Sequence, residues 1–170
     1  IQVAHPITVQ LAAEGQVCMG EPLELAATGA TGYQWINETV SLSNTSIGNP
    51  IARPAATTTF TVVGKDRANC FTDTASIRVV VKPLPSIDAG ADVELNPGDS
   101  YLMKTVASSD VASYTWTPAS YLSCANCPAP ETRPTQPIEY TVTVTNGDGC
   151  VALDKIAIAL NCKDSKVYIP

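Results

Sequence analysis

Tyr114-Thr115-Trp116 and, further along, Tyr140-Thr141-Val142-Thr143-Val144 decide the fold of this 170-residue chain. The second stretch alternates polar and apolar residues, as a strand with one buried face does. Both stretches have a counterpart about 80 residues earlier, in Tyr33-Gln34-Trp35 and Phe60-Thr61-Val62. Because self-similarity at a fixed spacing is typical of repeated modules, we expect one β-rich module written twice.

Further segments of the two halves correspond in the same order. Pro50 to Pro54 matches Pro130 to Pro134, Cys70 matches Cys150, and Asp73 to Val79 matches Asp154 to Leu160 with one residue added. Two prolines in Lys82-Pro83-Leu84-Pro85 predict an extended, semi-rigid linker. We therefore expect a first domain over 1–82, a linker over 83–85, a second domain over 86–162 and a connection over 163–170 toward a further domain.

Each half is predicted to contain five strands, and no segment shows helical periodicity. The predicted strands are Ile7–Leu11, Leu23–Ala27, Tyr33–Ile36, Thr58–Val63 and Ser76–Val81, then Val93–Leu95, Tyr101–Val106, Tyr114–Trp116, Glu139–Val144 and Lys155–Leu160. Short strands at this spacing predict a two-sheet sandwich with Greek-key connections. The expected fold is all-β, with two tandem immunoglobulin-like β-sandwiches in an elongated arrangement.

Composition and charge argue against several classes of function. The net charge of −6 and the pI of about 4.6 do not suit nucleic-acid binding, which needs basic side chains. No apolar stretch is long enough to cross a bilayer, so we expect no membrane insertion. The single histidine, His5, lies near the N-terminus without a recognisable catalytic motif around it, so we expect no enzymatic activity.

Six cysteines stand beside that single histidine. A zinc site would then need two Cys-x-x-Cys pairs, and only Cys124 and Cys127 have this spacing. Disulfides, and with them an oxidising compartment, are therefore the better interpretation. We expect Cys124 and Cys127 to form a small structural disulfide in a loop, because no helix follows that could make them a redox motif.

Cys150 and Cys162 remain by elimination. An extended strand between them would hold them much further apart than the ~7 Å between α-carbons that a disulfide permits. Their mutual bond therefore stays open, and either cysteine could pair elsewhere or be free.

The second half resembles a known repeat. Asp88-Ala89-Gly90-Ala91-Asp92-Val93, then Asn96-Pro97-Gly98-Asp99-Ser100, together with Tyr114-x-Trp116 and Tyr140 to Val144, resembles a polycystic-kidney-disease (PKD) repeat. The first half, with Val17-Cys18-Met19-Gly20 and Asn69-Cys70, is similar to immunoglobulin-like modules of large Bacteroidetes surface proteins. The resemblance implies a secreted protein on the exterior of a bacterial cell.

The end of the chain carries a third resemblance. Asn161-Cys162 followed by Val167-Tyr168-Ile169-Pro170 resembles the lead-in to the gliding-motility-associated C-terminal domain. Such a domain is the sorting signal of the type IX secretion system. This resemblance implies that the two modules directly precede an export signal.

The resemblance also implies a disulfide and a modification site. It suggests a bond between Cys18 and Cys70, although end-to-end stacking could instead place Cys18 beside Cys150 of the next module. The second half has Asn96 in place of Cys18, so Cys150 lacks a local partner. Asp73-Thr74-Ala75 is similar to O-glycosylation sites of Bacteroidetes exported proteins, which would place a glycan on Thr74.

Two further sets of residues have competing explanations. The Tyr-x-Trp pairs, Tyr33 with Trp35 and Tyr114 with Trp116, could form a platform for sugar rings, but a tryptophan on such a strand usually fills the core. Exposed loop residues such as Tyr121 and Trp116 remain candidates for contact with a glycan or a host protein. Asn146 to Gly149, and Asp88 with Asp92, offer oxygen ligands for calcium, but a tight hairpin turn explains the first group.

The sequence thus favours a non-catalytic spacer, without a cofactor, that contacts the neighbouring domains of its own polypeptide. An alternative is an adhesive module that binds carbohydrate or protein. Another is an accessory domain of an extracellular hydrolase.

Overall fold

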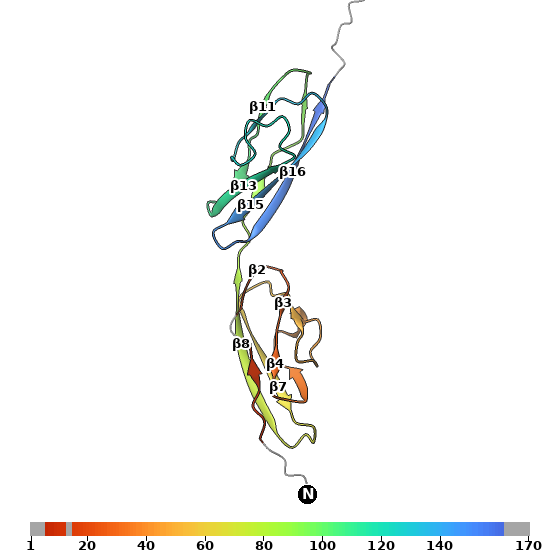
Figure 1. Cartoon of the computed structure of the whole chain (residues 1–170), viewed down its shortest axis with the longest axis vertical. Helices are drawn as coiled ribbons and strands as arrows, with labels where there is room; N and C mark the ends of the chain where they lie inside the picture. Colours follow the sequence, from red (N-terminus) through yellow and green to blue (C-terminus); the bar gives the residue numbers. More distant parts are fainter. Residues whose placement is uncertain (1–5, 13–14, 162–170) are drawn as a thin grey trace, which may run out of the picture. The chain divides into compact units, whose positions relative to one another are not determined.

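Strands make up nearly all the regular structure in the computed structural model, which describes residues 6–12 and 15–161 (Figure 1). The one other element in this part of the chain is a single 3-10 turn, Thr39–Ser41. The chain divides into two units, Ile1–Pro83 and Leu84–Pro170, so the division falls at the proline-rich linker.

Unit 1 contains one four-stranded sheet and two strand pairs. The sheet has the order β2-β8-β7-β5, and the pairs are β1-β4 and β3-β6. The strand bounds are β1 Gln10–Leu11, β2 Gln16–Cys18, β3 Leu23–Glu24, β4 Ala27–Thr28, β5 Gly32–Trp35, β6 Ile51–Ala52, β7 Thr58–Lys65 and β8 Thr72–Lys82. β2 runs parallel to the C-terminal half of β8, whereas the other pairings are antiparallel.

Unit 2 repeats this topology. Its sheet has the order β10-β16-β15-β13, with the pairs β12-β9 and β11-β14. The strand bounds are β9 Ile87–Asp88, β10 Val93–Leu95, β11 Tyr101–Leu102, β12 Val106–Ala107, β13 Val111–Thr117, β14 Glu131–Thr132, β15 Ile138–Asn146 and β16 Val151–Leu160. Each unit is an immunoglobulin-like β-sandwich, so the predicted all-β, immunoglobulin-like fold of the two halves is confirmed.

Each unit has its own core, built by the alternation of the long hairpin strands. In unit 1, Trp35 packs edge-on against Phe60, with ring centroids 6.5 Å apart. In unit 2, Trp116 packs edge-on against Tyr140 at the same distance. Aromatic pairs favour this edge-to-face arrangement. The repeated aromatic residues of the sequence therefore form the centres of two separate cores.

Several predicted strands differ from the observed ones. The predicted strand Leu23–Ala27 is two strands, because β3 pairs with β6 while β4 pairs with β1. Tyr101–Val106 is divided in the same way between β11 and β12. The short strands β2, β6, β9 and β14 were not predicted.

The predicted alignment of the last strands is wrong by two residues. Phe60 pairs with Ile77, and its counterpart Tyr140 pairs with Ile156 instead of Ile158. The hairpin turn of unit 1 contains one more residue than that of unit 2: Asp66 N–H bonds the carbonyl of Phe71, and Asn146 N–H bonds the carbonyl of Cys150. A shift of two residues keeps every side chain on its own face of the sheet, so alternation alone could not detect it.

Candidate functional site

The tryptophans of the two Tyr-x-Trp pairs lie in the cores. Trp35 is 1% exposed and Trp116 is 2% exposed. Tyr33 and Tyr114 are partly buried against the same cores. The prediction of core packing is confirmed, and the candidate role of Trp116 as a ligand contact is wrong because its indole is buried against Tyr140.

A buried hydroxyl network distinguishes the two cores. The Tyr140 hydroxyl lies 2.7 Å from Oγ1 of Thr132 and donates to the carbonyl oxygen of Ser120 at 2.8 Å. Burial raises the pKa of Tyr140 above its ordinary value of 10.0, partly offset by the bond to Thr132. Unit 1 has Phe60 and Ala52 in the corresponding places, both buried. A hydroxyl pair in one unit thus replaces an apolar pair in the other.

The loop after β13 contains the predicted disulfide between Cys124 and Cys127. The same loop covers the core tryptophan, because the main-chain N–H of Trp116 bonds the carbonyl of Ala125 at 2.8 Å. The disulfide therefore constrains a loop that covers the core. A disulfide in a loop that covers the core is expected to have a structural role.

The predicted bond between Cys18 and Cys70 is wrong, because Cys70 is a free, exposed cysteine. Cys18 aligns with Lys82 at the C-terminal end of β8, whereas Cys70 precedes Thr72, where β8 begins. At about 3.3 Å per residue, the length of β8 separates their main chains by roughly 30 Å, far beyond a disulfide's reach.

The bonding of the remaining cysteines, Cys18, Cys150 and Cys162, is known to different extents. Cys18 and Cys150 are both disulfide-bonded. Cys162 lies outside the described residues, so the structure does not test whether it bonds Cys150, a pairing that the sequence leaves open. The strand expected between those two cysteines is present as β16.

Tyr121 is the one predicted ligand contact that reaches the surface, with 38% of its area exposed. It adopts a left-handed conformation with φ of 66°, and its hydroxyl accepts a hydrogen bond from Oγ1 of Thr135 at 2.9 Å. Its ring borders a shallow hollow of about 370 Å³ that Glu131 and Arg133 also line. Aromatic, acidic and basic groups together could hold a polar ligand.

The side-chain oxygen atoms that the sequence offered as calcium ligands accept hydrogen bonds from main-chain N–H groups. Asn146 Oδ1 accepts hydrogen bonds from the N–H groups of Asp148 and Cys150. Asp88 Oδ1 accepts from Gly90, and Asp92 Oδ1 accepts from Ala157 of β16. Among the described residues, no group of three or more metal-binding side chains lies together.

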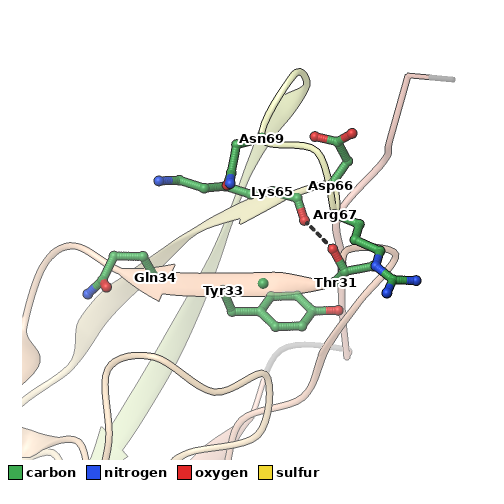
Figure 2. Close-up of a pocket in the computed structure, with 8 residues that line it drawn as sticks. Thr31, Tyr33, Gln34, Lys65, Asp66, Arg67 and Asn69 are labelled. Carbon is green, nitrogen blue, oxygen red and sulfur yellow. Dashed lines mark hydrogen bonds between the residues drawn. The ribbon is translucent and has the colours of Figure 1, made fainter. Parts of the chain in front are cut away.

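A second hollow, of about 510 Å³, lies in unit 1 between β5 and the β7–β8 hairpin (Figure 2). Its lining includes Tyr33, Gln34, Lys65, Arg67 and Asn69, and Lys65 and Arg67 are exposed. The neighbouring carboxylate of Asp66 accepts hydrogen bonds from backbone N–H groups, chiefly that of Phe71, and these lower its pKa. Sequence reasoning missed this hollow, because no local pattern distinguishes Lys65 at the end of β7 and Arg67 in the following turn from other exposed basic residues.

Three further observations concern predicted features. Thr74 is exposed on β8, opposite Val63, so an attached glycan would face outward. His5 lies outside the described residues. None of the helical structure in the described part of the chain is long and apolar enough to cross a membrane.

Comparisons with known proteins add structural likeness alone. No protein-family model matches the chain, and no curated protein matches it in sequence. Extracellular domains 3–5 of Drosophila OTK are similar in structure, with 11% identity and a TM-score of 0.41, over 91% of this chain and 62% of that one. The insect immune protein hemolin is also similar, with 10% identity and a TM-score of 0.46, over 91% of this chain and 47% of that one. The chain spans less than two thirds of the length of either structure.

Proposed function

We propose that the chain is a structural spacer of a secreted bacterial surface protein. In this role its two rigid modules hold a functional region away from the outer membrane and lead into a type IX secretion signal. The Bacteroidetes assignment, the PKD-type repeat and the export route rest on the resemblances of Asp88–Val93 and Val167–Pro170 in the sequence.

The observation that carries the proposal is that the same sandwich is built twice around its own aromatic centre. Trp35 with Phe60 and Trp116 with Tyr140 are used for packing. The Cys124–Cys127 disulfide supports an oxidising compartment, where such bonds persist. Modules whose large side chains are buried in independent cores suit a mechanical role.

A replacement series in the parent protein tests the spacer role. We expect deletion of residues 1–162 to shorten the reach of the surface protein, measured as the distance of an N-terminal label from the cell surface, without abolishing export. Substitution by an unrelated pair of immunoglobulin-like modules of equal length should restore the reach. Loss of export on deletion, or failure of the unrelated modules to restore reach, would count against the proposal.

The hollow beside Tyr121 favours a second candidate function, adhesion to a glycan or a host protein. An exposed aromatic ring between Glu131 and Arg133 offers a stacking surface flanked by charged groups. A glycan array with the chain, compared with the variant Tyr121→Ala, tests this function. Binding that the variant loses would support adhesion, whereas no binding by the chain at high concentration would remove glycan adhesion from consideration.

A further inference from the structure

The hollow of Figure 2 is lined mostly by polar side chains, and two of them are cations. Lys65 is the last residue of β7, Arg67 lies in the turn that leads to β8, and both are exposed. Within residues 6–12 and 15–161 neither of them forms an ion pair, whereas Lys155 pairs with Glu139 at 2.7 Å. The two positive charges are therefore available to a group from outside the chain.

The hairpin of unit 2 turns in the same way without basic residues. Asp66 and Asn146 are the equivalent residues from which the two turns start, so Lys65 corresponds to Thr145. The following turn of unit 2, residues 147–149, contains one acidic and no basic residue. The fold therefore does not require the two cations of unit 1.

An acidic side chain, Asp66, also lines the hollow, but the turn uses its carboxylate. The carboxylate accepts hydrogen bonds from the N–H groups of Cys70 at 2.7 Å and Phe71 at 2.9 Å. In Figure 2 it points away from β5. Because its lone pairs are directed at the main chain, the carboxylate offsets part of the positive charge without pairing with either cation.

Gly32 keeps the hollow open. It lies opposite Lys65 in the pairing of β5 with β7, and a β-carbon at this position would meet no heavy atom within 4 Å. Because paired side chains on neighbouring strands lie about 5 Å apart, any side chain at position 32 would stand beside Lys65. The volume of about 510 Å³ is within the usual range for a ligand site, roughly 300–1,000 Å³.

We propose that this hollow binds an acidic polysaccharide, whose carboxylate or sulfate groups contact Lys65 and Arg67. The planar guanidinium of Arg67 can donate two parallel hydrogen bonds to such an anion, and the Lys65 ammonium adds a point charge. The amides of Gln34 and Asn69 are exposed on the same hollow and can bond sugar hydroxyls. The site does not depend on the spacer role and is separate from the hollow beside Tyr121.

The lining favours a saccharide over an acidic peptide. Buried aromatic and aliphatic anchors supply most of the binding energy in contacts between proteins. The large apolar side chain at this hollow, Tyr33, is packed against the core of unit 1 and holds the main chain of Ala30 through its hydroxyl. The remaining lining side chains are polar, as a ligand covered with hydroxyls and anions requires.

The distribution of charge makes unit 1 the better of the two units for a polyanion. Residues 1–83 contain five basic and six acidic residues, whereas residues 84–170 contain five basic and ten acidic residues. At physiological salt, exposed charges more than about 8 Å apart are largely screened from each other. Two neighbouring cations on a nearly neutral unit can therefore attract an anion although the whole chain is acidic.

Titration calorimetry of the chain with defined polymers tests the proposal. The ligands are oligogalacturonate, which carries carboxylates, sulfated dextran, and neutral dextran. We expect one or both polyanions to bind, more weakly as salt is added, and the polyanion that binds identifies the anionic group. Binding of neither polyanion, or equal binding of neutral dextran, would overturn the proposal. Equal binding of oligoglutamate would overturn the assignment to a saccharide.

A pair of double variants tests the two cations. We expect K65A/R67A to bind the polyanion roughly tenfold more weakly, because two exposed charge contacts are lost. The matched control R78A/K104A also removes one arginine and one lysine, both exposed and outside the hollow, and should keep the affinity. An equal loss in both double variants would mean that only the total charge matters, which would overturn the site.

Gly32→Leu tests the hollow itself, because it fills the space and keeps every charge. Its main chain lies outside the left-handed region and its β-carbon has room, so we expect the variant to fold as the parent does, as denaturant unfolding would show. We expect it to weaken polyanion binding. An unchanged affinity would show that the polyanion does not enter the hollow, and the proposal would fail.

Discussion

The indole Nε1 of Trp116 donates a hydrogen bond to the carbonyl oxygen of Cys127 at 3.0 Å. Trp35 makes the same bond to Ile47 at 2.8 Å. The two loops are held differently: unit 2 uses the Cys124–Cys127 disulfide, whereas in unit 1 Asn44 Oδ1 accepts a hydrogen bond from the N–H of Ser46 at 2.8 Å. A covalent bond in one unit thus replaces a polar turn in the other, over the same core tryptophan.

Removing the disulfide should destabilise unit 2 alone. For C124S/C127S we expect the free energy of unfolding of unit 2 to fall by about 2 kcal/mol, because closing so short a loop restricts the unfolded chain only modestly. Hydrogen exchange followed by mass spectrometry in increasing denaturant reports each unit through its own peptides. The matched control C70S removes a free thiol and should leave both units unchanged. An effect of C124S/C127S on unit 1 equal to that on unit 2 would contradict the prediction.

The hydroxyl pair of unit 2 should behave as a coupled unit. Tyr140→Phe leaves the Thr132 hydroxyl without its buried partner, at a cost of about 1–3 kcal/mol. In Y140F/T132A the second change removes the Thr132 hydroxyl, which would otherwise lack a hydrogen-bond partner, and reproduces the apolar pair of Phe60 and Ala52. We therefore expect the double variant to be less destabilised than the sum of the single variants, by about 0.5–3 kcal/mol.

Denaturant unfolding of the four proteins measures this coupling. Phe60→Tyr in unit 1 is the reverse control, because it buries a hydroxyl beside Ala52, which offers no side-chain partner. Additive single effects would mean that the two hydroxyls do not stabilise each other.

The residues that form the cores could be predicted from the sequence, and the pairing of the cysteines could not. Trp35, Phe60 and their counterparts lie in stretches whose alternation defines one buried face by itself. The position of Cys18 depends on β2, a three-residue strand whose place is set by parallel pairing with the distant end of β8. Local patterns contain no information on where along β8 that pairing occurs, so the implied bond to Cys70 could not be tested against geometry.

The same limit applies to the candidate sites. Tyr121 could be selected from the sequence because it is an aromatic residue in a predicted loop, and it is exposed. The hollow beside Tyr33 could not be, since it joins β5 to a hairpin turn more than thirty residues away, as the bond from Thr31 Oγ1 to the carbonyl of Lys65 shows. Contacts of this kind appear only when the strands are paired.

Alkaline pH should destabilise unit 2 more than unit 1. The pKa of Tyr140 is raised in the folded state, chiefly by burial, so the folded protein retains a proton that the unfolded chain releases above pH 10. The stabilisation is fully present below the unfolded pKa and is lost as pH rises toward the folded pKa, by up to about 1.4 kcal/mol per pH unit. Denaturant midpoints of each unit between pH 9 and 11 measure this loss. In Tyr140→Phe the additional loss in unit 2 should disappear, and its persistence would contradict the assignment to Tyr140.

Two glycines with the same φ should tolerate alanine very differently. Gly29 and Gly90 both have φ of +90°, where an L-residue is strained by about 1–2 kcal/mol. A β-carbon on Gly29 would also overlap the carbonyl oxygen of Thr8, whereas on Gly90 the nearest atom is the carbonyl oxygen of Lys104 at 3.7 Å, an ordinary contact. Gly90→Ala should therefore cost the backbone strain alone. Gly29→Ala should cost clearly more, because the chain leading into β1 must move away from β4.

Hydrogen exchange of the β1 and β9 peptides, measured in each variant, compares the effects of the two substitutions. We expect protection of unit 1 to fall much more in Gly29→Ala than protection of unit 2 falls in Gly90→Ala. Gly20→Ala is a further control, since φ is +77° there and no atom lies within 4 Å of the added carbon. If Gly29→Ala were as mild as this control, β1 would have to shift freely, and Val9 could not then keep the 2.7 Å hydrogen bond from its N–H to Asp73 that joins it to β8.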